Sequence, residues 1–372
     1  MKIMIALNTA WNLVNFRAGL IRSLVASGFE VVAVAPKDEY VLRLSELGCR
    51  FVPLEMDNKG THPGRDLLLF CRFLKLLRQE RPDLLLAYTV KPNIYGSLAA
   101  NILRIPVVNN LAGLGSVFLC DNWLTRLVRR LYKIALSNSQ HVFFQNDEDL
   151  LMFVEEGLVM PNKVSRLPGS GINLMTFPYT PMQAHQNRPF QFLLVARLIW
   201  DKGVGEYIEA ARTIRLKYPD VKFQLLGFLD VKNPSAVSSK QMRDWVNEGL
   251  VEYLGVSDDV KPYLIEADCI VLPSYREGVP RSLLEAAAIG RPIITTDTIG
   301  CRDVVVDGLN GLLCRVKDAN DLAKKMIHMI KLSINERSAM GAAGRRKIER
   351  EFDEKIVINN YLQVIYESNQ GR

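Results

Sequence analysis

The sequence lacks the patterns that mark several common classes of protein. Its six cysteines are scattered over 372 residues without a C-x-x-C pair, which argues against a zinc site or a disulfide framework and fits a reducing compartment. No uncharged stretch approaches the roughly 18 residues of a membrane span, and "MKIMIALNTAWN" has no small-residue cleavage site. We therefore expect a cytoplasmic protein that neither spans a membrane nor is exported by a cleaved signal.

Cofactor and metal motifs are also missing. A dinucleotide-binding enzyme shows G-x-G-x-x-G after its first strand, but the turn here is "NTAWNLVNFRAG". No D-x-D pattern suits a metal, because the "DED" at residues 147–149 reads better as the acidic start of a helix. The sequence therefore predicts neither a bound cofactor nor a metal.

Positive charge is distributed unevenly along the chain. The net charge is +7, and residues 1–135 contain 18 Lys and Arg against 10 Asp and Glu, whereas the remainder is nearly balanced. This bias is well short of a nucleic-acid-binding tail. Charge is the only feature that favours the alternative of a non-enzymatic module that binds anions or nucleic acid.

Short apolar runs alternate with segments of helical period in two successive series. Runs rich in Val, Ile and Leu predict strands buried on both faces at residues 2–7, 30–36, 83–88, 105–110, 190–197, 221–227, 269–274 and 292–297. Helical periods predict helices at residues 16–28, 66–79, 203–218 and 281–290. The alternation predicts an α/β protein with two doubly wound domains.

The two series are separated by a segment of low periodicity with three prolines after Gly171. We predict a first domain over residues 1–170, a linker over 171–189 and a second domain over 190–352. The C-terminal helix, residues 353–372, could pack on either domain and is grouped with the first. Because open parallel sheets bind ligands beyond the carboxyl ends of their strands, two facing domains would form a cleft.

Two cations follow the first strand of the second domain. Arg197 ends this strand, and Lys202 stands with Gly203 just before the next helix. A helix N-terminus beside two cations suits a diphosphate, because the helix dipole and backbone N–H groups add to their charge. A pair of solvated loop cations is the alternative.

Two carboxylates flank the segment "EGVPRSLLE". Glu277 falls in the predicted loop "YREGVP", whereas Glu285 falls inside a helix among leucines and alanines, where a charge needs a polar partner. Gly278 has no side chain, so a ligand could approach the backbone closely at this position. Two such acceptors match two hydroxyl-bearing rings of one ligand, and the alternative is two surface glutamates.

The segment "REGVPRSLLE" has an E-x7-E arrangement and resembles the retaining nucleotide-sugar glycosyltransferases of family 4. That family has the GT-B fold of two facing Rossmann-like domains with an interdomain cleft. The resemblance continues through "VARLIWDKGVGEYIEAA" and "GCRDVVVDGLNGLLCRVKDANDLAKKM". It is looser in the first domain, through "FRAGLIRSLVASGFEVVAVAP" and "KPNIYGSLAA". The stretches "NNLAGLG", "REGVPRS" and "GCRDVVVDGLNG" most resemble bacterial enzymes of capsule and O-antigen assembly.

The resemblance implies roles for individual residues. Arg197 and Lys202 would neutralise the donor diphosphate. Glu277, with the backbone after it, would hold the hydroxyls of the transferred sugar, and Glu285 would accept hydrogen bonds from the ribose. The implied catalytic residues are Arg197, Lys202 and Glu277, within a donor site of Arg197, Lys202, Gly227, Glu277, Gly278, Val279, Pro280, Arg281, Ser282 and Glu285.

The acceptor side departs from the family pattern. Many members have a His after the strand that corresponds to "IPVVNN", but the stretch here is "NNLAGLG". The four histidines, at positions 62, 141, 185 and 328, all lie elsewhere. The base on this side therefore stays unidentified, and the expected acceptor-side residues are Asn15, Arg17, Lys91, Asn93, Gly113 and Gly115.

The segment "WLTRLVRRLYKIAL" is amphipathic. We predict one face formed by Arg126, Arg129, Arg130 and Lys133, and an opposite face formed by Leu124, Leu127, Val128, Leu131 and Ala135. The cationic face suits anionic lipid headgroups. A solvated surface helix is the alternative.

We expect a retaining, metal-independent hexosyltransferase. It would move galactose or an N-acetylhexosamine from a UDP donor to a polyprenyl-diphosphate-linked saccharide or another glycolipid in surface polysaccharide assembly. Its expected partners are the nucleotide-sugar donor, the lipid-linked acceptor and an anionic membrane, not nucleic acid, and its expected place is the inner face of the cytoplasmic membrane. The rival enzyme is a nucleotide-sugar epimerase of the same fold.

Overall fold

The chain folds into two compact units. The computed structural model describes residues 1–57, 62–112, 123–183, 188–229, 231, 233 and 235–370. One unit comprises Met1–Ser170 and Lys355–Arg372, and the other comprises Gly171–Glu354. Each unit has its own sheet and its own core, and they are described separately below.

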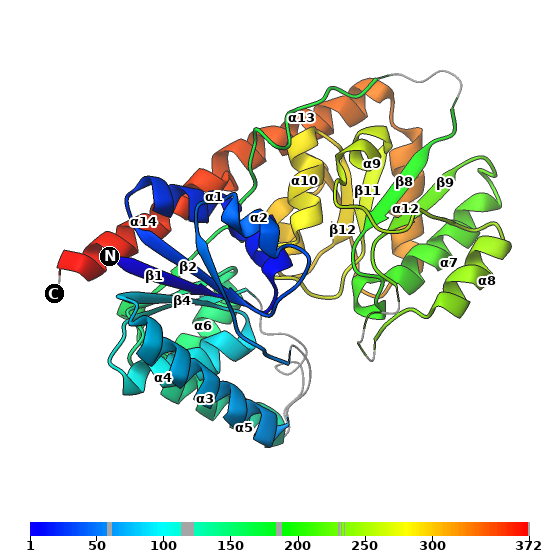
Figure 1. The fold of residues 1–372 in the computed structure, drawn as a ribbon. Coiled ribbons are helices and arrows are strands. Elements are labelled where there is room, and N and C mark those ends of the chain that lie inside the picture. Colours follow the sequence, from blue (N-terminus) through cyan, green and yellow to red (C-terminus); the bar gives the residue numbers. More distant parts are fainter. Residues whose placement is uncertain are drawn as a thin grey trace. The chain divides into compact units, whose positions relative to one another are not determined.

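The first unit contains an all-parallel sheet with the strand order β3-β2-β1-β4-β5-β6-β7. Its neighbouring strands β2, β1 and β4 are labelled in Figure 1. Its strands are β1 (Lys2–Ala6), β2 (Glu30–Ala35), β3 (Arg50–Pro53), β4 (Leu84–Tyr88), β5 (Val107–Leu111), β6 (His141–Phe144) and β7 (Val164–Arg166). The four strands predicted from apolar runs in this unit are confirmed. Their side chains are almost all buried because helices cover both faces of the sheet.

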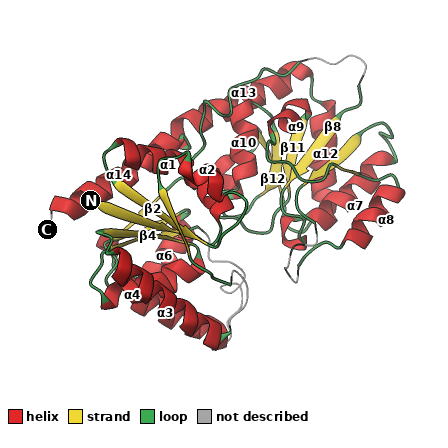
Figure 2. Ribbon diagram, viewed as in Figure 1, coloured by secondary structure: helices red, strands yellow, loops and turns green. Residues whose placement is uncertain are grey.

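Helices flank the first sheet on both faces (Figure 2). They are α1 (Ala10–Ala26), α2 (Val41–Ser45), α3 (Pro63–Glu80), α4 (Ser97–Ile102), α5 (Trp123–Leu136), α6 (Asp147–Glu155) and α14 (Glu354–Gln370). Alternate strand residues pack against α1, α2 and α14 on one face, and against α3 to α6 on the other. Val357, Tyr361 and Ile365 of α14 are buried in the same core as β1 and α1, so a late segment completes the first unit.

Helix α1 begins six residues before the predicted start at Phe16. The hydroxyl of Thr9 accepts a hydrogen bond from the N–H of Asn12 at 3.1 Å, which satisfies one of the free donors at the helix start. The asparagines of "AWNLVN" have low helix propensity, so the cap and the packing of Ala10 and Leu13 decide the start. The predicted acidic helix start is confirmed at α6, whose cap is Asn146.

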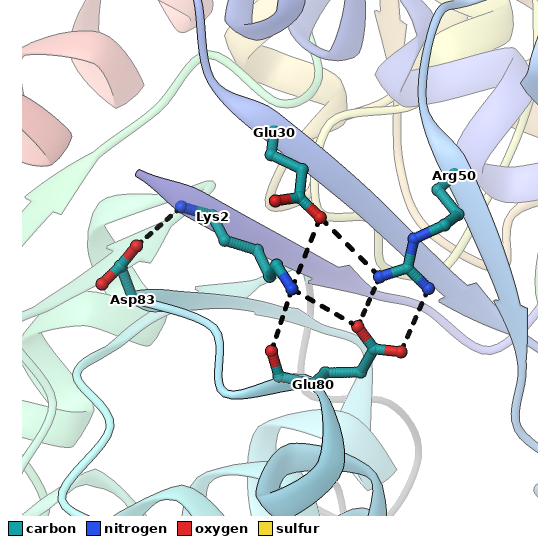
Figure 3. A network of polar contacts seen from close by, with 5 residues as sticks. All are labelled: Lys2, Glu30, Arg50, Glu80 and Asp83. Carbon is teal, nitrogen blue, oxygen red and sulfur yellow. Dashed lines mark hydrogen bonds and ion pairs between the residues drawn. The ribbon is translucent and has the colours of Figure 1, made fainter.

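An ion-pair network joins the amino ends of the first three strands (Figure 3). The Nζ of Lys2 lies 3.4 Å from Oε1 of Glu30 and 3.7 Å from Oε2 of Glu80, at the end of α3. Arg50 holds Glu80 with two hydrogen bonds, which lower the pKa of this carboxyl, whereas burial opposes the shift. The network ties the end of α3 to the edge of the sheet opposite the strands' carboxyl ends.

The second unit also contains an all-parallel sheet, with the order β10-β9-β8-β11-β12-β13. Its strands are β8 (Gln191–Val195), β9 (Lys222–Leu226), β10 (Glu252–Tyr253), β11 (Cys269–Leu272), β12 (Ile293–Thr296) and β13 (Gly311–Cys314). The four predicted strands of this unit are confirmed. The order reverses direction between β8 and β11, which is where doubly wound sheets bind ligands.

Helices cover both faces of the second sheet as well. They are α7 (Val204–Arg215), α8 (Ser239–Asn247), α9 (Lys261–Glu266), α10 (Arg281–Ile289), α11 (Cys301–Val304), α12 (Ala319–Lys331) and α13 (Ile334–Glu351). One core contains α7, α8 and α12, and the other contains α9, α10, α11 and α13. Within the described part of the chain, no helix combines the length and the apolar character that a bilayer crossing requires.

Candidate active site

The predicted donor residues gather at the carboxyl edge of the second sheet. Strands β9, β8, β11 and β12 are neighbours and run parallel, so the loops that follow them meet at one edge. The loop after β8 contains Arg197 and Lys202, and the loop after β11 contains Glu277. The tertiary fold thereby brings together residues that are about 75 positions apart in the chain.

Lys202 and Glu277 form an ion pair across two of these loops. The Nζ of Lys202, in a short 3₁₀ helix (Trp200–Lys202), contacts Oε1 of Glu277. The two side chains are only 17% and 12% exposed, so water screens the pair weakly. The sequence predicts a ligand contact for each residue but does not predict that, in the free protein, each neutralises the other.

The loop after β8 lies close to the loop after β11 because of Gly203. This residue has φ +73°, and a Cβ on it would lie 2.1 Å from the carbonyl oxygen of Pro273. The carbonyl of Asp201 accepts hydrogen bonds from the Ser274 hydroxyl at 3.1 Å and the Tyr275 N–H at 2.9 Å. These contacts place Lys202 within reach of Glu277.

The loop after β12 supports Glu277 from its other side. A Cβ at Gly300, where φ is +79°, would lie 2.1 Å from the carbonyl oxygen of Gly278. The N–H of Glu277 donates to the carbonyl of Ile299 at 3.2 Å, and the Thr298 hydroxyl donates to the carbonyl of Tyr275 at 3.0 Å. The sequence analysis did not include this loop in the site. The pattern that could have indicated it is the Thr-rich end of a strand followed by Gly in "TTDTIGC".

Glu285 also has a cationic partner. Its Oε1 accepts a hydrogen bond from Nε of Arg281 at 2.9 Å, one helical turn away in α10. The Arg281 guanidinium also donates to the carbonyl of Gly171 at 3.3 Å. Burial raises the pKa of Glu285 above its ordinary value, although Arg281 opposes the shift. The polar partner that this helical charge requires is therefore Arg281 in the free protein.

The remaining predicted donor residues occupy the same edge. Arg197 is exposed at the end of β8, and in the described part of the chain its side chain has no ion pair. Gly227 ends β9 with φ +148°, and a Cβ there would lie 1.8 Å from the carbonyl oxygen of Ala196. Pro280 is buried at the start of α10, whereas Val279 and Ser282 are partly exposed. Glycine at 227 thus permits the loops after β8 and β9 to touch.

Metal ligands are not clustered at this edge. Over the described ranges, no group of three or more His, Cys, Asp or Glu side chains is arranged to hold a metal ion. Among the predicted donor residues, the charged groups are Arg197 and the two ion pairs.

The expected acceptor-side residues lie at different depths in the first unit. Asn93 is buried, donates to the carbonyl of Asn110 at 2.8 Å, and accepts from the amide of Asn109 at 2.9 Å. Its amide therefore fixes the end of β5. Asn15 donates within α1 to the carbonyl of Trp11 at 2.9 Å. Arg17 is buried in α1, and Gly113 and Gly115 lie outside the described residues.

Lys91 borders a cavity of about 190 Å³ in the first unit. Its Nζ lies 2.9 Å from Oδ1 of Asp66. The other two cations are also paired, Arg65 with Asp57 at 3.0 Å and Arg72 with Glu55 at 2.9 Å. The cavity is lined by Glu55, Met56, Asp57, Arg65, Leu68, Leu69, Arg72 and Lys91. Because each cation has a carboxylate partner, this cavity has no spare positive charge.

None of the described histidines is among the predicted donor residues. His141 begins β6, lies 2.8 Å from the Ser165 hydroxyl, and has a pKa lowered by burial. His62 and His328 are exposed at the start of α3 and on α12. His185 falls outside the described residues.

Helix α5 is confirmed, but one of its predicted faces is wrong. Leu127 is 45% exposed and lies beside Ile134, which is 58% exposed, because positions seven apart share a helical face. Arg126, Arg130 and Lys133 are exposed next to them. Arg129 is only partly exposed and lies 3.2 Å from Glu156. The exposed face of α5 therefore combines three cations with two apolar side chains.

Comparisons with known proteins agree with this architecture. Residues 15–169 match the family described as Glycosyl transferase 4-like domain, and residues 180–347 match Glycosyl transferases group 1. The solved structure of Anabaena HepE in complex with UDP has a TM-score of 0.78 at 17% identity, covering 99% of this chain and 100% of that chain. This likeness confirms the predicted fold class.

Two curated relatives extend the match along the chain. The N,N'-diacetylbacillosaminyl-diphospho-undecaprenol alpha-1,3-N-acetylgalactosaminyltransferase of Campylobacter jejuni is 30% identical over 370 residues, covering 94% of each protein. The UDP-Gal:alpha-D-GlcNAc-diphosphoundecaprenol alpha-1,3-galactosyltransferase of Escherichia coli is 25% identical over 280 residues, covering 71% of this chain and 70% of that protein. The chain therefore belongs to the family 4 glycosyltransferases, which have the GT-B fold.

Proposed function

We propose that the chain transfers galactose or an N-acetylhexosamine from a UDP-linked donor to a saccharide on polyprenyl diphosphate, in surface polysaccharide assembly. The observation that carries the proposal is the match over 94% of the chain to a transferase whose acceptor is a diphospho-undecaprenol saccharide. A second relative is named for a UDP-galactose donor and the same kind of acceptor. Neither of these relatives is an epimerase, so transfer is the reaction we propose.

On the donor side, the paired charges would exchange partners when the donor binds. Lys202, with Arg197, would turn to the diphosphate, and Glu277 would accept hydrogen bonds from hydroxyls of the sugar. Glu285 would leave Arg281 for the ribose hydroxyls. This exchange gives Lys202, Glu277 and Glu285 hydrogen bonds to the ligand, and Arg281 keeps its hydrogen bond to the carbonyl of Gly171, so no charge is left buried without a partner.

We further propose that transfer retains the anomeric configuration and needs no divalent metal. The bond between the sugar's anomeric carbon and the diphosphate oxygen breaks, and a bond to the acceptor hydroxyl oxygen forms. The acceptor proton passes to the diphosphate oxygen that leaves. Arg197 and Lys202 would stabilise the charge that develops on this oxygen, which is the task a metal performs in other transferases.

An assay of transfer tests the proposal directly. Purified protein is incubated with UDP-galactose, UDP-N-acetylgalactosamine or UDP-N-acetylglucosamine and a short polyprenyl-diphosphate saccharide, with EDTA present. We expect one donor to give an extended saccharide, and NMR of the new bond to show the donor's anomeric configuration. Conversion of the donor sugar without acceptor would instead establish epimerisation, and inverted product would contradict retention.

The protein is also proposed to bind the inner face of the cytoplasmic membrane as a peripheral protein. The exposed face of α5 suits this role, because its cations would contact anionic headgroups while Leu127 and Ile134 enter the interface. We expect sedimentation with phosphatidylglycerol vesicles, and release by salt. The variant R126E/R130E/K133E should stay in solution.

A matched variant controls for total charge in this test. K217E/K240E/K324E reverses three exposed lysines of the second unit and changes net charge equally. It should sediment like the unmodified protein. Equal loss of binding in both variants would show that overall charge, not α5, drives association.

A further inference from the structure

Arg17 is a buried cation to which the described residues offer no counter-ion. Its side chain projects from α1 and is only 5% exposed. Its guanidinium carbon lies 4.4 Å from the centre of the Tyr88 ring, and Nη1 makes one long hydrogen bond, 3.3 Å, to the carbonyl of Phe16. Among the described residues, no carboxylate lies within ion-pair distance of it, and its Nε has no acceptor.

The groups around Arg17 are neutral and incompletely satisfied. Tyr88 ends β4, Asn110 lies beside it on β5, and Tyr361 reaches them from α14. Asn110 donates to the Tyr361 hydroxyl at 2.9 Å, but its Oδ1 is buried without a partner. The Tyr88 hydroxyl lies near Tyr361 without a hydrogen bond of normal geometry. Burial raises the pKa of both tyrosines, so neither supplies a compensating negative charge.

A second buried arginine shows what a structural role requires. Arg291 is 2% exposed, and its guanidinium donates to the carbonyls of Thr180 at 2.8 Å and Ile265 at 2.9 Å. Those carbonyls replace the water that burial removes. The described residues offer Arg17 no comparable set of acceptors. Keeping it buried lowers stability unless an anion occupies the site in the working protein.

We propose that Arg17 binds a phosphoryl group of a substrate at the carboxyl edge of the first sheet. Tyr88 and Asn110 stand at the carboxyl ends of adjacent strands, which is the edge where open parallel sheets bind ligands. The guanidinium N–H groups and the Tyr88 O–H are donors, which suit phosphate oxygens. The identity of this phosphoryl group rests on the proposed function. If that function holds, the group that Arg17 binds is the diphosphate of the polyprenyl-linked acceptor.

Binding measurements with simple probes test the site without a transfer assay. Inorganic pyrophosphate, farnesyl diphosphate and UDP are titrated into the full chain and into R17M, R17K and R22M. Arg22 is exposed on the same helix and serves as the matched control. We expect R17M to lose at least about tenfold in affinity for pyrophosphate and farnesyl diphosphate, the scale of one charged hydrogen bond. R17K, which keeps the charge but not the planar fork, should lose less, and R22M should bind normally.

The melting temperature of the unliganded variants separates this role from a structural one. Because R17M removes an uncompensated charge and keeps most of the side-chain volume, its melting temperature should equal or exceed that of the unmodified protein. Normal probe affinity in R17M and R17K, or a lower melting temperature with unchanged pyrophosphate affinity, would overturn the proposal. Loss confined to UDP would support the phosphoryl site and overturn its assignment to the acceptor. If R17M loses pyrophosphate binding while the unmodified protein is inactive toward lipid-linked saccharides, the phosphoryl site is supported and the proposed function is contradicted.

Discussion

The carboxyl edges of the two sheets differ in how their buried cations are paired, although the cations around the cavity of the first unit also have carboxylate partners. In the second unit, Lys202 and Arg281 are paired with Glu277 and Glu285. In the first unit, Arg17 is buried without a carboxylate among the described residues, while the ion pairs around Arg50 lie at the opposite, amino edge (Figure 3). Paired side chains are stable without a ligand and can exchange partners when one binds. A buried cation without a carboxylate partner instead indicates a site that is stabilised only when an anion is bound. Substitution of these charged residues at the carboxyl edges should therefore affect function, whereas substitution of those at the amino edges should affect stability.

The largest effect is expected from the cations of the second unit. Lys202→Ala or Arg197→Ala should lower kcat by about 10²–10³-fold, because each removes a preorganised group that stabilises the leaving diphosphate. Lys222→Ala is the matched control, since Lys222 pairs with Glu252 at 3.0 Å at the amino edge of the same sheet. Steady-state kinetics would contradict the comparison if all three variants lost activity alike.

Glu285→Ala should have the next largest effect. Loss of a charged hydrogen bond to the ribose should weaken UDP binding by about 1.5–3 kcal/mol, measured by calorimetry. Glu277→Ala should act mainly on transfer, because its proposed contacts are to the sugar. Unchanged UDP affinity in Glu285→Ala would confine Glu285 to its contact with Arg281.

The raised pKa of Glu285 gives a dependence of donor affinity on pH. Only the ionised carboxylate accepts from both ribose hydroxyls, so affinity for UDP-galactose should fall as pH drops through this pKa, which lies above the ordinary 4.5. UDP-galactose is preferred to UDP because its diphosphate does not titrate in this range. Glu285→Gln should bind more weakly and show no such fall. A parallel fall in the Gln variant would assign the effect to another group.

Histidine substitutions should have small effects. We expect no single change at His62, His141, His185 or His328 to lower kcat by more than about tenfold, since a true general base contributes about 10²–10⁴-fold. His141 lies at the amino end of β6, and His62 and His328 are exposed. A thousandfold loss at one histidine, with UDP binding intact, would show that the first unit supplies a base.

The smallest effect is expected at the amino edge of the first sheet. Arg50→Ala should lower the free energy of unfolding by about 0.2–1 kcal/mol, typical of exposed ion pairs, and leave UDP affinity unchanged. Because Arg50 lowers the pKa of Glu80, the stabilisation is present above the ordinary pKa of 4.5 and is lost as pH falls through the lower pKa of the folded state. Urea titrations at pH 7 and pH 3.5 should show this difference shrinking. A loss of several kcal/mol would give the network a larger role than its exposure suggests.

Local sequence patterns predicted eight strands, because buried parallel strands read as continuous apolar runs, but they did not predict β3, β6, β7, β10 or β13. They could not predict that Lys202 meets Glu277, since that contact depends on close approaches at Gly203 and Gly300 between loops distant in sequence. Leu127 was assigned to the face of α5 opposite the cations because it is hydrophobic, but its 45% exposure depends on neighbouring elements that the sequence does not show. Arg17 was predicted on the acceptor side, but the lack of a counter-ion among the described residues is a property of the tertiary structure that the sequence could not reveal.

The return of α14 to the first unit has a consequence for the order of folding during synthesis. The second unit is continuous in sequence, so it can fold as soon as Glu354 has left the ribosome. The first unit is made earlier but lacks Val357, Tyr361 and Ile365 until translation is nearly finished. Its nascent form must therefore expose part of an apolar core throughout the synthesis of the second unit. The N-terminal half of this polypeptide should accordingly depend on chaperones more than the C-terminal half does.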